Sequence, residues 1–158
     1  MNPPRILLPV LLLLCGITFG APGPAPVLFV CEHGSVKSLM AASLFNQAAA
    51  KRHLPFRAIA RGVTPDASVP AQVAAALTEE GFIVKDFVPA RFSEVDVGSA
   101  SRIIAIGVDP SVLSPDSKAP IDTWNDVPAA SVNYSAARAS LQQHIDALLT
   151  VLQKQRDH

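Results

Sequence analysis

Apolar runs and helix-like segments alternate along most of this 158-residue sequence, and that alternation restricts the fold more than any other feature. The run VLFVC at 27–31 contains no charged position, which is typical of a strand covered on both faces. Apolar periodicity predicts further strands at 56–61 and 101–108, and helices at 37–53, 69–81 and 137–155. Strands separated by helices form parallel sheets, so we expect one α/β domain with three layers, a doubly wound parallel sheet with helices on both faces.

The first 20 residues differ from the rest of the chain. Arg5 precedes an apolar run, Ile6 to Cys15, which is too short to span a membrane and is interrupted by Pro9. Small residues around Gly20 suit cleavage after that position. We therefore expect a signal peptide at 1–20, a mature domain at 21–158, and an exported protein, periplasmic or secreted, with no membrane association after cleavage. The alternatives are an uncleaved anchor and a lipid attached to Cys15.

Charge and cysteine content narrow the possible partners. The chain carries 13 Lys and Arg residues against 13 Asp and Glu residues. This balance does not indicate nucleic acid or an acidic membrane surface as a binding partner. Its four histidines are scattered without metal-ligand spacing, so we expect neither a metal nor another cofactor. Because cleavage would remove Cys15, Cys31 would be a lone thiol, either buried and inert or reactive.

The segment CEHGSVKS at 31–38 joins the first predicted strand to the first predicted helix. Amides of such a loop, and of a helix N-terminus at the carboxyl edge of a parallel sheet, bind oxyanions. Both the helix terminus and Lys37 favour the thiolate of Cys31, and the Ser38 hydroxyl can donate to its sulfur. The pattern predicts Cys31 as a nucleophile above an oxyanion-binding loop that consists of Glu32, His33, Gly34, Ser35, Val36 and Lys37. Gly34 suits a left-handed backbone in the middle of this loop.

This motif resembles that of a known family. C-x5-K-S after VLFV, followed by LMAASLFN, is similar to the loop of the low-molecular-weight protein tyrosine phosphatases and their arsenate reductase relatives, which is C-x5-R-S. The stretch FRAIARGVTPDASVPAQVAAALTEEGF is closer to the reductases. The resemblance extends from about Val27 to the last predicted helix. It implies the fold of that family and hydrolysis of phosphate monoesters, with phosphotyrosine as the substrate class.

Several positions depart from the family pattern. Lys37 stands where the family has arginine, so a point charge replaces a bidentate guanidinium. The family's general acid belongs to W-x-x-P-D-P, whereas this chain has WNDVPA at 124–129. Asp126 is therefore the provisional acid, and Asp109 is a second carboxylate at the same edge of the sheet. Glu32 repels an anion unless it points away or pairs with a base.

Three functions follow from this pattern. In the first, Cys31 attacks phosphorus, the loop amides and Lys37 hold the oxygens, Ser38 stabilises the thiolate and Asp126 supplies a proton. The second is arsenate reduction with an external thiol, because Val36 and Val108 occupy the places of the second thiol in thioredoxin-coupled relatives. The third is a catalytically degenerate module that binds an oxyanion or a protein through the same loop. The expected partners are a phosphate- or arsenate-like oxyanion and a phosphotyrosine protein.

The leader gives the first testable prediction. Because small residues stand at Thr18 and Gly20, the exported protein should begin at Ala21, which mass spectrometry of the purified protein measures directly. An intact Met1 would show an uncleaved anchor, and a lipid mass on Cys15 would show a lipoprotein. Either result would contradict cleavage after Gly20.

Overall fold

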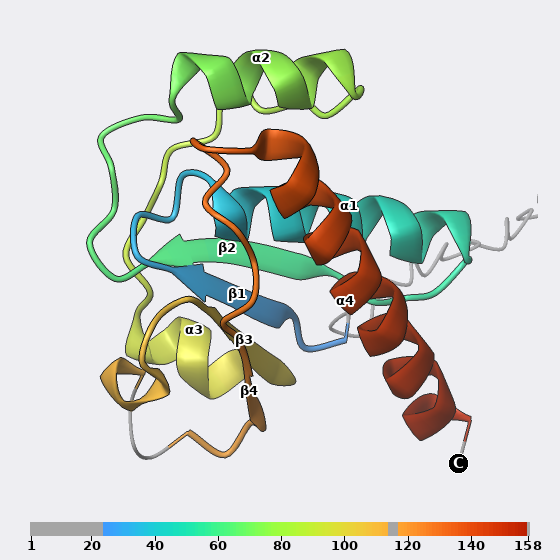
Figure 1. Ribbon diagram of the computed structural model, residues 1–158. Helices are drawn as coiled ribbons and strands as arrows, with labels where there is room; N and C mark the ends of the chain where they lie inside the picture. Colours follow the sequence, from blue (N-terminus) through green and yellow to red (C-terminus); the bar gives the residue numbers. More distant parts are fainter. Residues whose placement is uncertain (1–23, 114–116, 158) are drawn as a thin grey trace, which may run out of the picture.

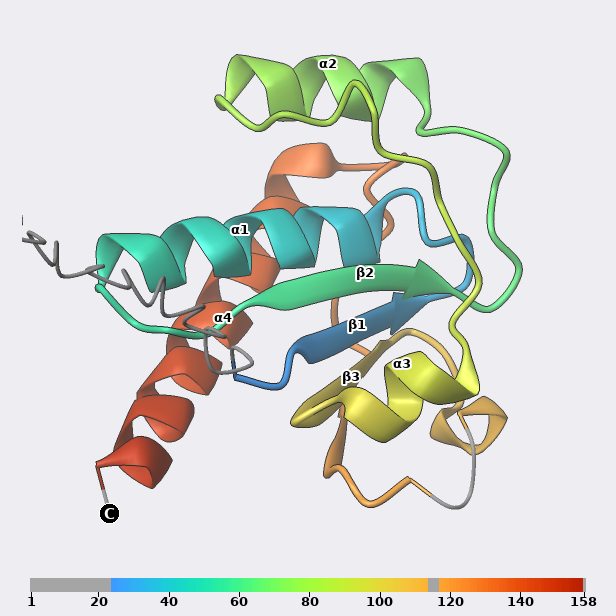
Figure 2. The same ribbon diagram turned by 180° about the vertical axis from the view of Figure 1, so that it is seen from behind.

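A computed structural model describes residues 24–113 and 117–157, so the predicted leader lies outside the described residues. Four parallel strands form one sheet in the order β2-β1-β3-β4, and these are β1 Val27–Cys31, β2 Ala58–Gly62, β3 Arg102–Ile106 and β4 Ile121–Trp124. The helices are α1 Lys37–Lys51, α2 Ala71–Glu79, α3 Glu94–Ser99 and α4 Tyr134–Arg156, with a short 3-10 helix η1 at Pro110–Val112. Helices α1 and α4 cover one face of the sheet and α3 lies on the other (Figures 1 and 2). The predicted three-layer α/β fold with a parallel sheet is confirmed.

Strand β1 lies inside the sheet and is buried along its whole length. Its side chains alternate between the two faces, as the period of a strand requires. Phe29 and Cys31 belong to the larger apolar cluster under α1 and α4. Leu28 and Val30 belong to the smaller cluster, which includes Val97 of α3. Because both faces are covered, an uninterrupted apolar run is the pattern that this strand needs.

Helix α1 begins directly after the loop that follows β1. Val36 is its N-cap residue, and no side chain caps the first turn. The free N–H groups of that turn therefore face the carboxyl edge of the sheet without a partner from a capping side chain. The other end of α1 carries Lys51 in its last turn. His53, two residues after the end of the helix, adopts a positive φ of 53°.

Two elements of the structure lie in stretches where we predicted none, one before and one after the predicted strand at 101–108. Helix α3 begins at a capping box, in which Ser93 and Asp96 satisfy each other's backbone N–H groups. Strand β4 has only four residues and lies at the edge of the sheet, so its sequence lacks a continuous apolar run. The sequence predicted three strands, and the fourth is a correction. Helix α4 begins at Tyr134, three residues before the predicted start, because Asn133 caps it by accepting from the Ala136 amide.

Within the described residues, the helices are too short or too polar for any of them to cross a membrane.

Candidate active site

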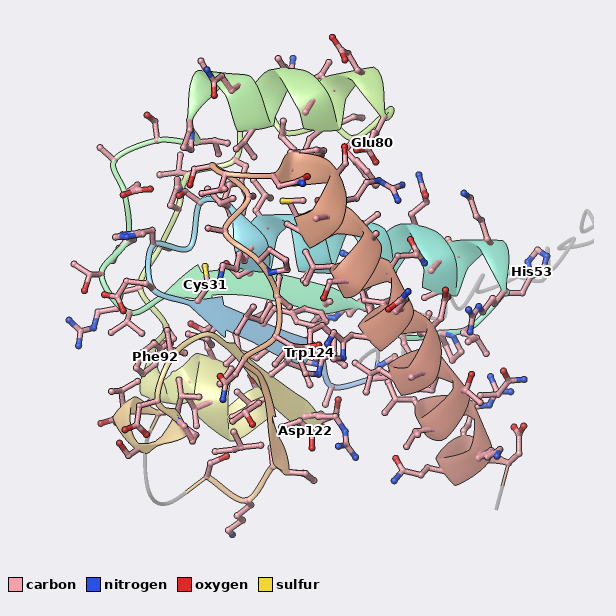
Figure 3. The ribbon with its side chains drawn as sticks, in the orientation of Figure 1. Cys31, His53, Glu80, Phe92, Asp122 and Trp124 are labelled. Carbon is pink, nitrogen blue, oxygen red and sulfur yellow. The ribbon has the colours of Figure 1, made fainter. Side chains whose placement is uncertain are left out.

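Cys31 occupies the carboxyl end of β1, and its side chain is 5% exposed (Figure 3). The backbone N–H of Gly34 donates to Sγ at 3.3 Å, and Ser38 Oγ lies 3.2 Å from the same sulfur. Ser38 is completely buried in the first turn of α1. When the sulfur is a thiolate, both groups act as donors to it and stabilise its negative charge. The structure thus brings together Cys31, Gly34 and Ser38, as the sequence predicts.

The carbonyl groups at the start of the loop are turned away from the cavity by the segment after β2. The amides of Val63, Thr64 and Asp66 donate to the carbonyl oxygens of Cys31, Glu32 and His33 at 3.1, 2.8 and 3.0 Å. A carbonyl that accepts from outside the loop does not face a bound anion. The N–H groups are therefore left to line the inner side, which is the arrangement of an anion-binding loop.

A close contact between two glycines holds the loop in this shape. Gly34 has a φ of +67°, and a Cβ built on it would lie 2.8 Å from the Gly62 nitrogen. A Cβ on Gly62 would in turn lie 2.7 Å from the Gly34 nitrogen. Neither backbone can retreat easily, because Gly62 is the last residue of β2 and pairs with Cys31. Glycine is needed at both positions, at Gly34 also for its left-handed backbone.

Asp66, which the sequence analysis did not single out, supports the loop from outside. Its carboxylate accepts a hydrogen bond from Ser35 Oγ, and its Oδ1 lies 3.5 Å from Nδ1 of His33. Ser35 is fully buried, so this hydrogen bond satisfies a hydroxyl that water cannot reach. The signal available in the sequence was TPDAS at 64–68, a turn-forming stretch directly after a predicted strand.

Lys37 lies at the first position of α1 and lines the cavity above Cys31. Its Nζ donates to the carbonyl oxygen of Val127 at 3.2 Å. A Cβ built on Gly107 would lie 3.2 Å from the same Nζ, so the glycine leaves room for the ammonium group. An ammonium group has three donors, and one is used here. Lys37 therefore joins the loop to the segment after β4 and keeps donors for an anion.

A cavity of about 220 Å³ opens above the thiol. It is lined by Cys31, Glu32, His33, Val36, Lys37, Ile106, Gly107, Ala129, Ala130 and Ser131. The predicted loop residues Glu32, His33, Val36 and Lys37 are thus on the cavity wall, whereas Gly34 and Ser35 support the loop from behind. The sequence analysis did not predict the contribution of 129–131, because these small residues carry no chemical signal of their own.

Asp126, the provisional acid, is not among the residues that line this cavity. Its two carboxylate oxygens lie 2.9 and 3.0 Å from Nε2 of His144 on α4. The hydrogen bond with His144 lowers the pKa of Asp126 below its usual range, so this carboxyl group is ionised near neutral pH and carries no proton to give. The His144 ring stacks on Trp124, with ring centroids 4.6 Å apart. The role of Asp126 as general acid stays a prediction, and it requires this ion pair to open.

Asp109, the second carboxylate considered, also lies outside the wall of the cavity. Its Oδ1 accepts from the Ser111 amide at 2.9 Å and so caps η1. That backbone hydrogen bond lowers the pKa of Asp109. The position is accounted for by loop structure.

A second cavity of about 260 Å³ shares part of its wall with the first, namely Val36, Ala130 and Ser131. Its other lining residues come mainly from α2 and the start of α4, and they are Pro70, Gln72, Val73, Ala76 and Tyr134. The Tyr134 hydroxyl donates to Glu80 at 2.9 Å, and burial together with this hydrogen bond raises the pKa of Tyr134 to about 12. The wall of this second cavity is mostly apolar. The Tyr134 phenol on it stays protonated near neutral pH, because its pKa is raised.

Among residues 24–113 and 117–157, no three His, Cys, Asp or Glu side chains are grouped so that they could hold a metal ion. The chemistry available at Cys31 is that of a thiol among hydrogen-bond donors and one ammonium group.

Comparison with known proteins agrees with this geometry. The family model of the low molecular weight phosphotyrosine protein phosphatases matches residues 26–111, which include the loop after β1. A search of curated protein sequences gives no significant match.

Solved structures share the architecture at low sequence identity. YfkJ from Bacillus subtilis is 23% identical, with a TM-score of 0.72 over 86% of this chain and 99% of its own. The thioredoxin-dependent arsenate reductase Cg_ArsC1' from Corynebacterium glutamicum is 18% identical, with a TM-score of 0.71 over 85% of this chain and 65% of its own. The YwlE arginine phosphatase from Geobacillus stearothermophilus is 20% identical, with a TM-score of 0.67 over 84% of this chain and 96% of its own. At these identities the similarity shows the fold alone.

The glycine contact generates a prediction about loop shape. Gly62→Ala should push the loop away from β2, because the new Cβ would meet the Gly34 nitrogen. We expect a loss of stability of about 1–3 kcal/mol, measured by urea unfolding, together with a weaker affinity for inorganic phosphate, measured by calorimetry. Gly98→Ala is the matched control, since nothing lies within 4 Å of its added Cβ. Equal phosphate affinity in the two variants would contradict the role of this contact.

Proposed function

Because the chain belongs to the low molecular weight phosphotyrosine protein phosphatase family, we propose that it hydrolyses phosphate monoesters through a phosphocysteine formed on Cys31. The observation that carries the proposal is the environment of the sulfur. The Gly34 amide and the Ser38 hydroxyl contact Sγ from within the protein, and the cavity lies on its open side. A thiol held in this way can attack phosphorus without first finding a base.

Each side chain of the loop then has a defined task. The Cys31 thiolate attacks phosphorus opposite the ester oxygen, and the P–O bond to the leaving group breaks. Loop amides whose carbonyls are bound on the outer side, and the remaining donors of Lys37, hold the phosphoryl oxygens, on which negative charge is spread. Water then attacks the phosphocysteine, and inorganic phosphate and free thiolate result. Ser38 stabilises the Cys31 thiolate as it leaves phosphorus in this second step.

The second cavity supports aromatic esters, including phosphotyrosine, as the substrate class. Its mostly apolar wall adjoins the cavity above the thiol through Val36, Ala130 and Ser131. An aryl group attached to the phosphoryl oxygen can bury its ring there while the phosphate stays over Cys31. We also propose that the protein is exported, so that its substrate would be met outside the cytoplasm.

Arsenate reduction and anion binding without turnover are the competing functions. Reduction needs a second thiol after attack on arsenate. In the described part of the chain Cys31 is the one free cysteine, and Val36 lines the cavity where a relative carries a thiol. No contact in the site favours reduction over hydrolysis. Binding without turnover would follow if Lys37 held the oxygens too weakly in the transition state.

Covalent trapping tests the proposal. When the protein reacts with an aryl phosphate and is quenched rapidly, mass spectrometry should find a phosphoryl group on Cys31, and turnover should be inhibited by vanadate. Cys31→Ser should lose turnover and should show no thiol-bound phosphate. Arsenite release that depends on an added thiol, without phosphate hydrolysis, would favour the reductase. Phosphate binding without any adduct would favour the binding module.

The lysine in place of the family arginine gives a further prediction. Lys37→Arg should raise kcat/KM for an aryl phosphate about tenfold, because a guanidinium holds two equatorial oxygens of the transition state at once. Gly107 has no side chain beside this position, where a Cβ would lie 3.2 Å from the Lys37 Nζ. Steady-state kinetics measure the gain, and Cys31→Ser in the same background should abolish it. An unchanged rate in Lys37→Arg, with phosphate still bound, would contradict a catalytic role for the position.

A further inference from the structure

The hydrolysis proposed above needs a proton for the leaving-group oxygen, and the described structure does not place Asp126 where it can give one. The side chains with titratable groups on the cavity wall are Cys31, Glu32, His33 and Lys37. Cys31 is the nucleophile, and the Lys37 ammonium is turned to the carbonyl of Val127. Two groups on the wall, Glu32 and His33, are left to exchange a proton with the substrate.

The His33 ring lies beside the Asp66 carboxylate. Its Nδ1 lies 3.5 Å from Asp66 Oδ1, so Nε2 is the ring nitrogen left for a substrate. The side chain is 60% exposed, and it is also part of the cavity wall. A ligand can therefore reach it at the mouth of the cavity. An imidazole fixed by a carboxylate on one nitrogen and free on the other is the arrangement that general acid–base catalysis uses.

Asp66 is itself anchored on two sides, which makes the orientation specific. Its carboxylate accepts from the buried Ser35 hydroxyl, and its amide donates to the His33 carbonyl at 3.0 Å. The carboxylate thus cannot turn away without leaving Ser35 unpaired inside the protein. Glu32 has no comparable partner among the described residues. An exposed carboxyl group is normally ionised at neutral pH and has no proton to give, whereas imidazole exchanges its proton in that range.

We propose that His33 is the general acid and base of this site, with Asp66 as its positioning residue; the inference rests on the proposed hydrolysis. In the first step the Cys31 thiolate bonds to phosphorus, the ester P–O bond breaks, and the leaving oxygen takes the proton from Nε2 of the imidazolium. In the second step water bonds to phosphorus and gives a proton back to Nε2. The P–S bond then breaks, and the electron pair returns to Cys31 as thiolate.

The dependence of rate on the leaving group distinguishes this role from a structural one. A nitrophenolate leaves without a proton, whereas the anion of an unsubstituted phenol needs one. His33→Asn should lower kcat/KM, which reports the step in which the ester bond breaks, about 100-fold or more for phenyl phosphate and much less for p-nitrophenyl phosphate. His53→Asn is the matched control, since His53 lies beyond the far end of α1 from Cys31 (Figure 3). The His53→Asn variant should change the hydrolysis rate of both esters only slightly and to the same extent.

Asp66→Asn tests the positioning role. The amide oxygen can still accept from Ser35, but the negative charge beside His33 is lost. Phenyl phosphate should again be affected more than p-nitrophenyl phosphate, although less than in His33→Asn. Thermal unfolding and phosphate affinity of both variants should match the wild type, which separates catalysis from loop collapse.

The other outcomes are equally definite. Equal losses of kcat/KM for the two esters in His33→Asn would overturn the assignment while the hydrolysis itself stands. A loss confined to phenyl phosphate in Glu32→Gln or Asp126→Asn, with His33→Asn unaffected, would give the role to that carboxylate. If the wild type turns over neither ester and forms no Cys31 adduct, the proposed function fails and the assignment of His33 falls with it.

Discussion

The contact between the Gly34 and Gly62 backbones is the constraint on which the rest of the site depends. Cys31 and Gly62 are paired at the ends of neighbouring parallel strands, so the loop after β1 must turn directly over the end of β2. Without side chains at either glycine, the loop packs close enough for the segment after β2 to bind its carbonyls. The amides then face inward, and one of them reaches the sulfur. A side chain at either position would separate these groups and remove the anion-binding shape.

The parallel fold could be predicted because the central strand and the long helices carry strong local signals. β1 matches its predicted bounds, since its apolar run ends where the polar loop begins. α1 and α4 follow from apolar periodicity, and only their ends differ from the prediction. By contrast, β4 is short and takes its place from hydrogen bonds to β3, and α3 depends on the cap at Ser93. Tertiary pairing, which a single strand does not reveal, decides such elements.

The sequence indicates which groups lie together where they belong to one loop, and it carries no signal for contacts between distant segments. The sequence spacing of Cys31, Gly34, Lys37 and Ser38 predicts that they lie close together, because a strand end, a turn and a helix start follow one another there. The contact of Asp66 with Ser35 spans 31 positions, and that of Lys37 with Val127 spans 90. No local pattern indicates such pairs. Asp126 illustrates the same limit, since its neighbour His144 lies on the next helix and not in its own segment.

The described segment after β4 places no carboxyl or imidazole group on the cavity wall. Lys37 binds the Val127 carbonyl, and His144 on α4 binds the Asp126 carboxylate, so each of these adjoining residues already has a partner. What remains over the cavity is the small side chains of 129–131, which shape the wall but exchange no proton. The proposed hydrolysis would then take its proton from the loop itself. The loop offers one imidazole that is both accessible and fixed by a carboxylate, and the backbone that orients it also directs the amides toward the sulfur. Nucleophile, anion cradle and proton donor would thus depend on a single structural unit, the loop after β1 packed on the turn after β2.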